Sequence, residues 1–201
     1  MRATRVLLPL ALSMAACTAQ ADLLYTFDTG AQGFTVTSGG ALYDNAGYLA
    51  IADIDNQDMD LIVPLAAGTT DWSGYLGGTL SLDAINLNGW QESDWPTFGL
   101  IRLTSATAGS VAFDFVPVLE PTSEWKTYSV RFDDDTFGPS LAAVLASLTR
   151  VTINLESGNG PIEYVGIDNV RITSAVPEPQ TWAMGLAGLA LVGGLSRRKR
   201  G

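Results

Sequence analysis

The sequence predicts an all-β domain, a two-sheet antiparallel β-sandwich with one short helix. Segments such as residues 79–85 and 125–132 alternate apolar and polar side chains with a period of two, as strands with one buried face do. Glycine, asparagine and aspartate separate these segments at intervals typical of a sandwich. Only one segment has the periodicity of a helix.

The predicted strands follow one another between residues 23 and 172. They cover residues 23–27, 33–37, 48–52, 59–63, 79–85, 98–103, 111–116, 125–132, 151–155 and 164–172. The strands at 98–103 and 111–116 are expected to pair as a hairpin, because Gly109 and its neighbours form a turn between them. The predicted helix covers residues 140–148 and follows Pro139, since proline is favoured in the first turn of a helix.

Residues 1–21 are predicted to be a signal peptide. Arg2 and Arg5 precede a short apolar core, and Ala19 and Ala21 fit the small-x-small rule for cleavage after Ala21. The alternative is lipidation, because the residues ending at Cys17 weakly resemble a lipobox. Plain cleavage would remove Cys17, the only cysteine, and leave a mature chain without a disulfide.

The last 26 residues, 176–201, are predicted to form a C-terminal address of three parts. An apolar stretch over residues 181–195, predicted as a hydrophobic helix, lies between a proline motif and a basic cluster. Such a helix rises about 22 Å, against about 30 Å of bilayer hydrocarbon, so it is marginal as a permanent anchor. The motif consists of Val176, Pro177, Glu178 and Pro179, and the cluster of Arg197, Arg198, Lys199 and Arg200.

This order of parts resembles the PEP-CTERM sorting signal of Gram-negative bacteria that make exopolysaccharide. The resemblance implies that an exosortase, a membrane protease-transpeptidase, recognises the tail and removes it. Because basic clusters stay on the cytoplasmic side, the body is expected beyond the inner membrane, in the outer envelope or the extracellular matrix. The alternative is an ordinary C-terminal membrane anchor that is never cut.

The remaining body, residues 22–175, has the length of one domain. It contains five basic and 20 acidic side chains, a net charge of −15. This charge argues against nucleic acid and anionic membrane surfaces as partners and favours divalent cations, neutral sugars or a basic partner. The chain has no histidine, which excludes Ser-His-Asp and Cys-His catalytic sites and the common zinc sites.

Three segments of the body, residues 61–82, 125–148 and 164–172, occur in an order that resembles the laminin B (domain IV) family and its bacterial jelly-roll relatives. The resemblance implies a two-sheet jelly roll. It implies no ligand, because that fold serves in adhesion, in sugar binding and in purely structural modules.

Two groups of aspartates are candidate calcium sites, because calcium prefers clustered oxygen ligands. Asp53, Asp55 and Asp58 lie in one acidic run, for which the alternative is a solvated turn. Asp28 ends the first predicted strand and Asp168 lies in the last. Jelly-roll sugar-binding modules, which the body resembles, often keep a structural calcium where these strands meet. The alternative for this pair is a turn or hydrogen-bonding role.

The tryptophans are the candidate sugar-binding residues. Trp90 and Trp95 lie in a polar loop, where their rings could stack on sugars while Gln91 and Asp94 form hydrogen bonds. The alternative is that these two rings cap one end of the sandwich. Two further tryptophans, Trp72 and Trp125, sit at positions similar to those of the laminin B family and are predicted to lie in the core. The acidic run at 133–135 is predicted to be a charged loop.

These features predict a non-catalytic exported protein of the envelope or extracellular matrix, sorted by an exosortase and associated with exopolysaccharide. One alternative is a carbohydrate-binding module that uses the Trp90 and Trp95 loop. Another is a calcium-dependent glycosidase, which needs two carboxyl groups at a suitable separation. The available carboxyls include Asp83, Asp114, Glu120 and Glu124, but the Glu-x-Asp-x-x-Glu motif of sandwich glycosidases is absent from the sequence.

Overall fold

The computed structural model describes residues 21–175, apart from 38, 46, 55–56, 66–69, 90–92 and 159–162. The sorting segment and the signal peptide up to residue 20 lie outside the described residues, as do Asp55, Trp90 and Gln91. No helix in the described part is both long and apolar enough to cross a membrane.

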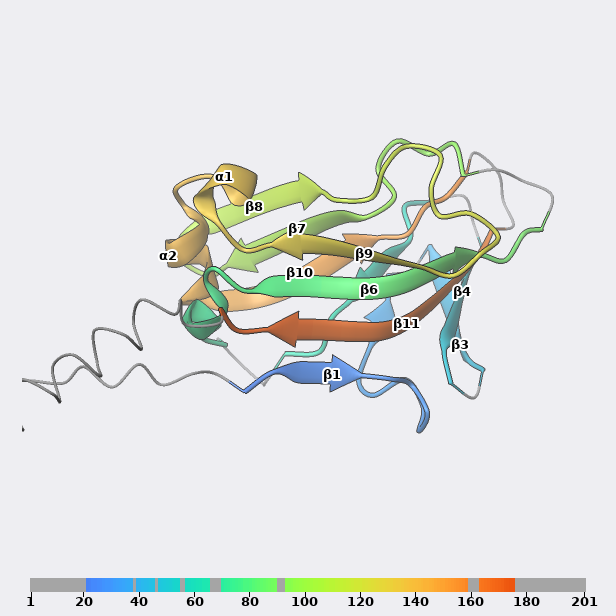
Figure 1. The fold of residues 1–201 in the computed structure, drawn as a ribbon, viewed down its shortest axis with the longest axis horizontal. Helices are drawn as coiled ribbons and strands as arrows, with labels where there is room; N and C mark the ends of the chain where they lie inside the picture. The colour runs from blue at the N-terminus through green and yellow to red at the C-terminus, as the bar shows by residue number, and fades with distance from the viewer. Residues whose placement is uncertain are drawn as a thin grey trace, which may run out of the picture.

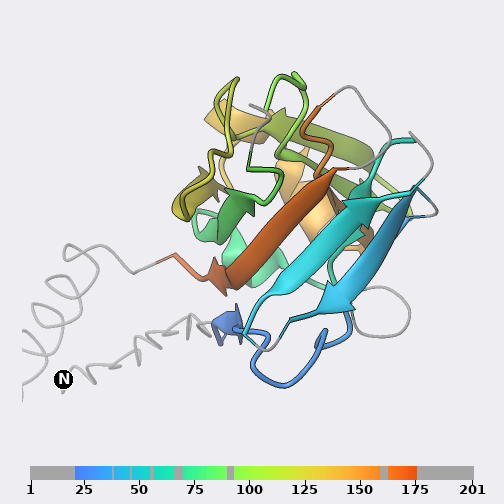
Figure 2. The same ribbon diagram turned by 90° about the vertical axis from the view of Figure 1, so that its right-hand side faces the viewer.

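The described chain forms two antiparallel sheets packed face to face, which confirms the predicted sandwich (Figure 1). The first sheet has the order β3-β4-β11-β6-β9, and β1 also pairs with β11. Its strands are β1 (Leu23–Tyr25), β3 (Gly40–Asp44), β4 (Leu49–Asp53), β6 (Thr79–Asn86), β9 (Lys126–Arg131) and β11 (Tyr164–Thr173). Figure 2 shows β11, β4 and β3 side by side in this sheet.

The second sheet has the order β2-β5-β10-β7-β8. Its strands are β2 (Thr35–Val36), β5 (Asp60–Ile62), β7 (Leu100–Ser105), β8 (Gly109–Asp114) and β10 (Leu148–Asn154). The strands β7 and β8 form the predicted hairpin. Three short helices lie together at one end of the sandwich (Figure 1). They are η1 (Ser73–Tyr75), α1 (Asp134–Phe137) and α2 (Leu141–Leu145).

The core lies between the sheets and follows the alternation of the strands. In β6, Leu80 and Leu82 are fully buried, whereas the intervening Ser81 and Asp83 face outwards and are half-buried. Ile101 of the second sheet is among the buried residues that complete this cluster. The period of two in the sequence therefore reports directly which side chains enter the core.

Three local features differ from the prediction. β3 was not predicted, because it begins with glycine and its side chains are only partly buried or exposed. The predicted helix is shorter, since Leu148 already begins β10. The acidic run 133–135 is the start of α1, where the Asp133 carboxylate accepts a 3.0 Å hydrogen bond from the Thr136 amide and caps the helix.

Both ends of the described chain lie at the end of the sandwich that holds the helices, which we call the terminal end (Figure 1, left). The Tyr75 hydroxyl donates a 2.7 Å hydrogen bond to the Ala21 carbonyl. The Ser174 amide donates a 3.1 Å bond to the Asp22 carboxylate. β11 begins at the opposite, distal end, and its ten residues span roughly 30 Å.

Candidate functional site

A line of residues crosses the outward face of the first sheet at the distal end. Tyr43 of β3 pairs with Ala50 of β4, Ala50 with Gly166 of β11, and Gly166 with Ile85 of β6. The register of β9 against β6 places Trp125, which directly precedes β9, beside Ile85. The line therefore runs from one edge strand, β3, to the other, β9.

Trp125 lies on this face with 44% of its surface exposed, so the prediction that it belongs to the core is wrong. Its indole reaches over Gly166, because a Cβ at that glycine would lie 3.0 Å from Trp125 Cη2. The Tyr48 ring meets the indole edge to face, with centroids 5.5 Å apart and planes at 76°. A glycine and a second ring thus hold the indole across the strands.

Tyr43 and Tyr164 are also exposed on this face. Together with Asn45, Ala50 and Leu87 they line an open hollow of about 430 Å³. Ala50, the neighbour of Tyr43 across the β3–β4 pair, contributes only a short side chain to this lining. We call the four rings of Tyr43, Tyr48, Trp125 and Tyr164 the aromatic row.

Carboxylates lie two residues along the strands from this line, towards the terminal end. Asp168 of β11 pairs with Asp83 of β6, which pairs with Thr127 of β9. The Thr127 hydroxyl donates to Asp83. The Asn169 amide group donates to Asp83 at 2.8 Å and to Asp168 at 3.1 Å. Asn169 has a φ of 48°, a left-handed conformation that asparagine tolerates, at the irregularity in β11.

A third carboxylate, Asp28, belongs to the same group. Asp28 is close to the β3–β4 turn, because a Cβ on Gly47 would lie 3.9 Å from its Oδ1 atom. Partial burial raises the pKa of Asp168, and the charges of Asp83 and Asp28 raise it further. The hydrogen bond from the Asn169 backbone N–H lowers it. We call Asp28, Asp83 and Asp168 the acidic row.

The predicted calcium ligands therefore have different surroundings. Asp28 and Asp168 interact electrostatically, and both accept hydrogen bonds, Asp28 from the Thr26 hydroxyl at 2.8 Å. Asp53 is buried and Asp58 is exposed. Within the described ranges, no group of three or more His, Cys, Asp or Glu side chains could hold one metal ion. Calcium binding stays a prediction, which a change of melting temperature on chelation would test.

The loop that was predicted to carry the sugar platform lies against the loop that follows β10. Trp95 is half-buried and Asp94 is exposed. The Asp94 amide donates a 3.0 Å bond to the Ser157 carbonyl, and the buried Ser93 hydroxyl donates a 2.7 Å bond to the Pro121 carbonyl. These bonds attach the described part of the loop to its neighbours. A ligand-binding role for Trp95, as for Trp90 and Gln91, stays a prediction.

Three carboxyl groups are buried at the distal end, and only one of them, Asp53, was a candidate site residue in the sequence. Asp53 and Glu163 lie next to each other on neighbouring strands, since the Asp53 amide bonds to the Glu163 carbonyl. The Glu156 carboxylate accepts a 3.2 Å bond from the Met59 amide. Burial, together with the charges of Glu163, Asp53 and Asp58, raises the pKa of Glu156 to about 7. Glu163 lies two residues before the buried Val165. Because side chains two residues apart on a strand face the same side, this spacing predicts that Glu163 points into the core.

Three of the four carboxyls considered for a glycosidase are engaged in structural contacts, and the fourth, Glu124, is exposed. Glu120 accepts bonds from the Lys126 ammonium and, at 2.8 Å, from the Tyr128 hydroxyl. Asp114 accepts a 3.4 Å bond from the Val116 amide, and partial burial raises its pKa. Asp83 is bound by Thr127 and Asn169 as described above.

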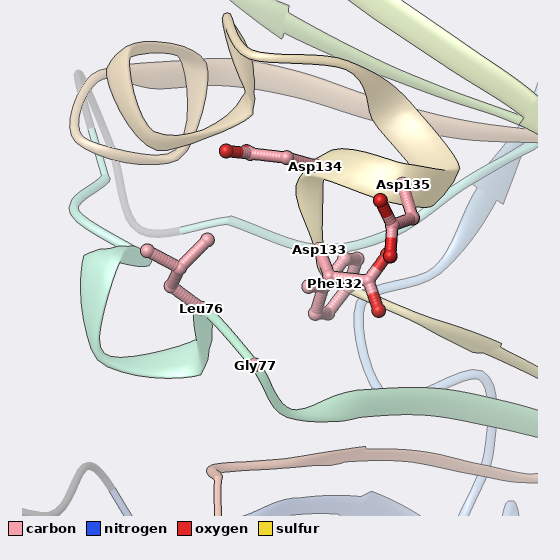
Figure 3. Close-up of a pocket in the computed structure, with 6 residues that line it drawn as sticks. All are labelled: Leu76, Gly77, Phe132, Asp133, Asp134 and Asp135. Carbon is pink, nitrogen blue, oxygen red and sulfur yellow. The ribbon is translucent and has the colours of Figure 1, made fainter.

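A second hollow, of about 310 Å³, lies at the terminal end (Figure 3). Its lining consists of Leu76, Gly77, Phe132, Asp133, Asp134 and Asp135. Asp133 caps α1, and Asp134 and Asp135 lie in its first turn, where acidic side chains stabilise a helix. The acidic lining thus has a structural explanation.

Residues 175–200 match the PEP-CTERM protein-sorting motif, which confirms the predicted C-terminal address. The motif implies processing by an exosortase and sorting of a secreted protein to the envelope. A search of curated proteins found no significant match to the chain.

Solved structures with a similar fold include an agarase and a laminin domain, both with TM-scores above 0.5. The agarase AgWH50C is 14% identical with a TM-score of 0.57, and the match covers 78% of this chain and 25% of the agarase. The L4b domain of human laminin alpha-2 is 11% identical with a TM-score of 0.51, and the match covers 78% of this chain and 98% of that domain. The chain thus spans about a quarter of the agarase.

A third similar structure is the CBM22-1 xylan-binding domain from Paenibacillus barcinonensis. It is 12% identical with a TM-score of 0.49, and the match covers 77% of this chain and 94% of that domain. At these identities the likenesses show the fold alone. The chain therefore combines a β-sandwich similar in fold to the laminin L4b domain with a C-terminal PEP-CTERM sorting motif.

Proposed function

We propose that the chain is a non-catalytic, exported polysaccharide-binding protein whose binding surface is the aromatic row. The observation that carries this proposal is the exposure of Trp125, Tyr43 and Tyr164 on one sheet face. Exposed aromatic groups that gather on one face mark interaction sites, and aromatic rings offer flat apolar surfaces on which sugar rings stack.

The course of the row favours a polymer over a small molecule. The line of residues crosses five strands, roughly 19 Å at the usual strand spacing, from edge strand β3 to edge strand β9. The row therefore ends at an edge of the sheet on both sides, where no further strand blocks it. A long glycan chain could lie along it and continue beyond the domain at either side, whereas a small ligand would need a closed pocket.

The position of the sorting segment is compatible with this role. Ala175, after which the sorting segment continues, follows β11 at the terminal end. The aromatic row lies at the distal end, roughly 30 Å away along β11. A chain held by its C-terminal segment would thus leave the aromatic face free to contact extracellular polysaccharide.

A non-catalytic role is favoured by the state of the nearby carboxylates. Asp83 and Asp168 share the Asn169 side chain as a donor, and Asp83 is bound by Thr127 as well. They serve to hold three strands in place on this face. The chain also has no histidine that could act as a general base.

Affinity electrophoresis of the mature protein in gels that contain polysaccharide tests the proposal. Trp125→Ala and Tyr43→Ala should fold normally and lose retention. Leu76→Ala is the matched control, because Leu76 is an exposed apolar side chain at the terminal end. Full retention in both aromatic variants would show that the aromatic row is not the binding surface. Loss of retention in Trp95→Ala alone would place the site on the loop that the sequence predicted.

A further inference from the structure

We infer that the aromatic and acidic rows together select a polysaccharide that carries free amino groups, such as a de-N-acetylated amino-sugar polymer. This inference rests on the proposed function and names the substrate class of the same surface. It differs from a general sugar-binding role because it requires the carboxylates as well as the rings.

The two rows share one face and lie within reach of a single sugar unit. Gly166, under the Trp125 indole, and Asp168 face outwards two residues apart on β11, which corresponds to about 6.6 Å. Asp83 lies opposite Asp168 on the neighbouring strand. A sugar ring stacked on the indole would therefore place a substituent near these carboxylates.

No basic side chain neutralises the acidic row within the described part of the chain. The two ion pairs found there, Lys126 with Glu120 and Arg131 with Asp133, involve other carboxylates. Arg171 is the next cation along β11 and pairs in register with Ser81, beyond the irregularity that follows Asp168. The row thus presents uncompensated negative charge beside the rings.

An ammonium group matches this surface chemically. It offers three N–H donors, and its hydrogen bonds to carboxylates are charge-assisted and stronger than those of a hydroxyl group. Aromatic faces also attract cations, so the Trp125 and Tyr48 rings would favour the same ligand. A uronate polymer would be repelled by like charge, and an uncharged glycan would gain stacking and hydrogen bonds to the carboxylates without the attraction between opposite charges.

The test compares oligosaccharides of equal length binding to the mature protein at low salt, by calorimetry. The probes are glucosamine oligomers, N-acetylglucosamine oligomers and oligouronates. We expect glucosamine oligomers to bind about tenfold more tightly than the acetylated ones, and oligouronates to show no binding. The advantage should shrink as salt screens the charges.

Asp168→Asn and Asp28→Asn should each reduce the preference for glucosamine oligomers and leave affinity for the acetylated probe unchanged. Asp135→Asn is the control, because it removes one exposed charge at the terminal end and should change neither affinity. An equal loss of preference in the control would show a net-charge effect and overturn the inference.

Different results would overturn the preference for amino sugars and the proposed polysaccharide-binding function. Equal affinity for both amino-sugar probes, unaltered by Asp168→Asn but abolished by Trp125→Ala, would overturn the inference and leave the proposed function intact. Absence of binding to every glycan, in the wild-type protein, would reject both. Binding that persists in Trp125→Ala would reject the aromatic row as the site.

Discussion

The two ends of the sandwich differ in the way that they use tryptophan. At the terminal end, Trp72 is 2% exposed and packs against Tyr75 and Phe132, with centroids 5.6 and 6.5 Å apart. At the distal end, Trp125 is 44% exposed and lies on the sheet surface. The terminal end therefore uses its aromatic rings to close the core where the chain termini meet, whereas the distal end presents them to solvent.

The largest expected effect comes from removing each tryptophan in turn. Trp72→Ala should lower the free energy of unfolding by about 3 to 5 kcal/mol, because it leaves a cavity in the core. Trp125→Ala should lower it by about 1 kcal/mol or less, because nearly half of the side chain is already exposed. Urea unfolding measures both values. Equal destabilisation would show that Trp125 closes the core as Trp72 does.

The buried carboxyls at the distal end predict that stability depends on pH between about 4.5 and 7. The pKa of Glu156 is raised from 4.5 to about 7, so the folded chain keeps a proton that the unfolded chain releases between these values. Stability should therefore fall as the pH rises from about 4.5 to 7 and level off above. Unfolding in urea across this range measures the slope.

Glu156→Gln should remove most of this slope, because an amide cannot ionise. Glu124→Gln is the control, since Glu124 is exposed. The groups that face Glu156 are Glu163, Asp53 and Asp58, together with the Met59 amide. An unchanged slope in Glu156→Gln would assign the pH dependence to another of these carboxyls.

Gly166 allows a test of how the distal end positions its exposed tryptophan. A Cβ at this position would lie 2.6 Å from Ile85 Cγ2 and 3.0 Å from the indole, so Gly166→Ala must displace the Ile85 side chain and push the Trp125 ring outwards by a few tenths of an ångström. We expect a loss of about 1 to 3 kcal/mol in stability and a weaker retention by polysaccharide. Retention equal to that of the wild type would show that the position of the indole over β11 is not needed for binding.

The strands could be predicted because their alternation reflects burial directly, but the aromatic row could not. Its rings come from residues 43, 48, 125 and 164, and only the register of five strands brings them together. The acidic row depends on the same register, which joins Asp83 to Asp168. Pairing between distant strands leaves no local pattern in the sequence.

Trp125 is a different case, because its direction was visible in the sequence. It shares the parity of Thr127 and Ser129, which are exposed, and alternates with the buried Tyr128 and Val130. The core prediction followed the position of a tryptophan in a family that the sequence resembles and overrode this alternation. The local pattern was the better guide, because it reports the face of the strand in this chain.

The smallest expected effect concerns the terminal end and the site of signal cleavage. The Tyr75 hydroxyl donates to the carbonyl of Ala21, a residue that cleavage after Ala21 would remove. Tyr75→Phe should therefore destabilise a chain that begins at Ala21 by about 1 kcal/mol more than a chain that begins at Asp22.

Comparing the two chains cancels the other contacts of Tyr75, because both chains share them. Urea unfolding of the four proteins gives the difference, and the N-terminal sequence of the exported protein shows which chain is natural. If Tyr75→Phe costs the same in both chains, the bond to Ala21 adds no stability, and the remaining contacts of Tyr75 hold the terminal end together. An exported chain that begins at Cys17 would instead retain the bond and support lipidation.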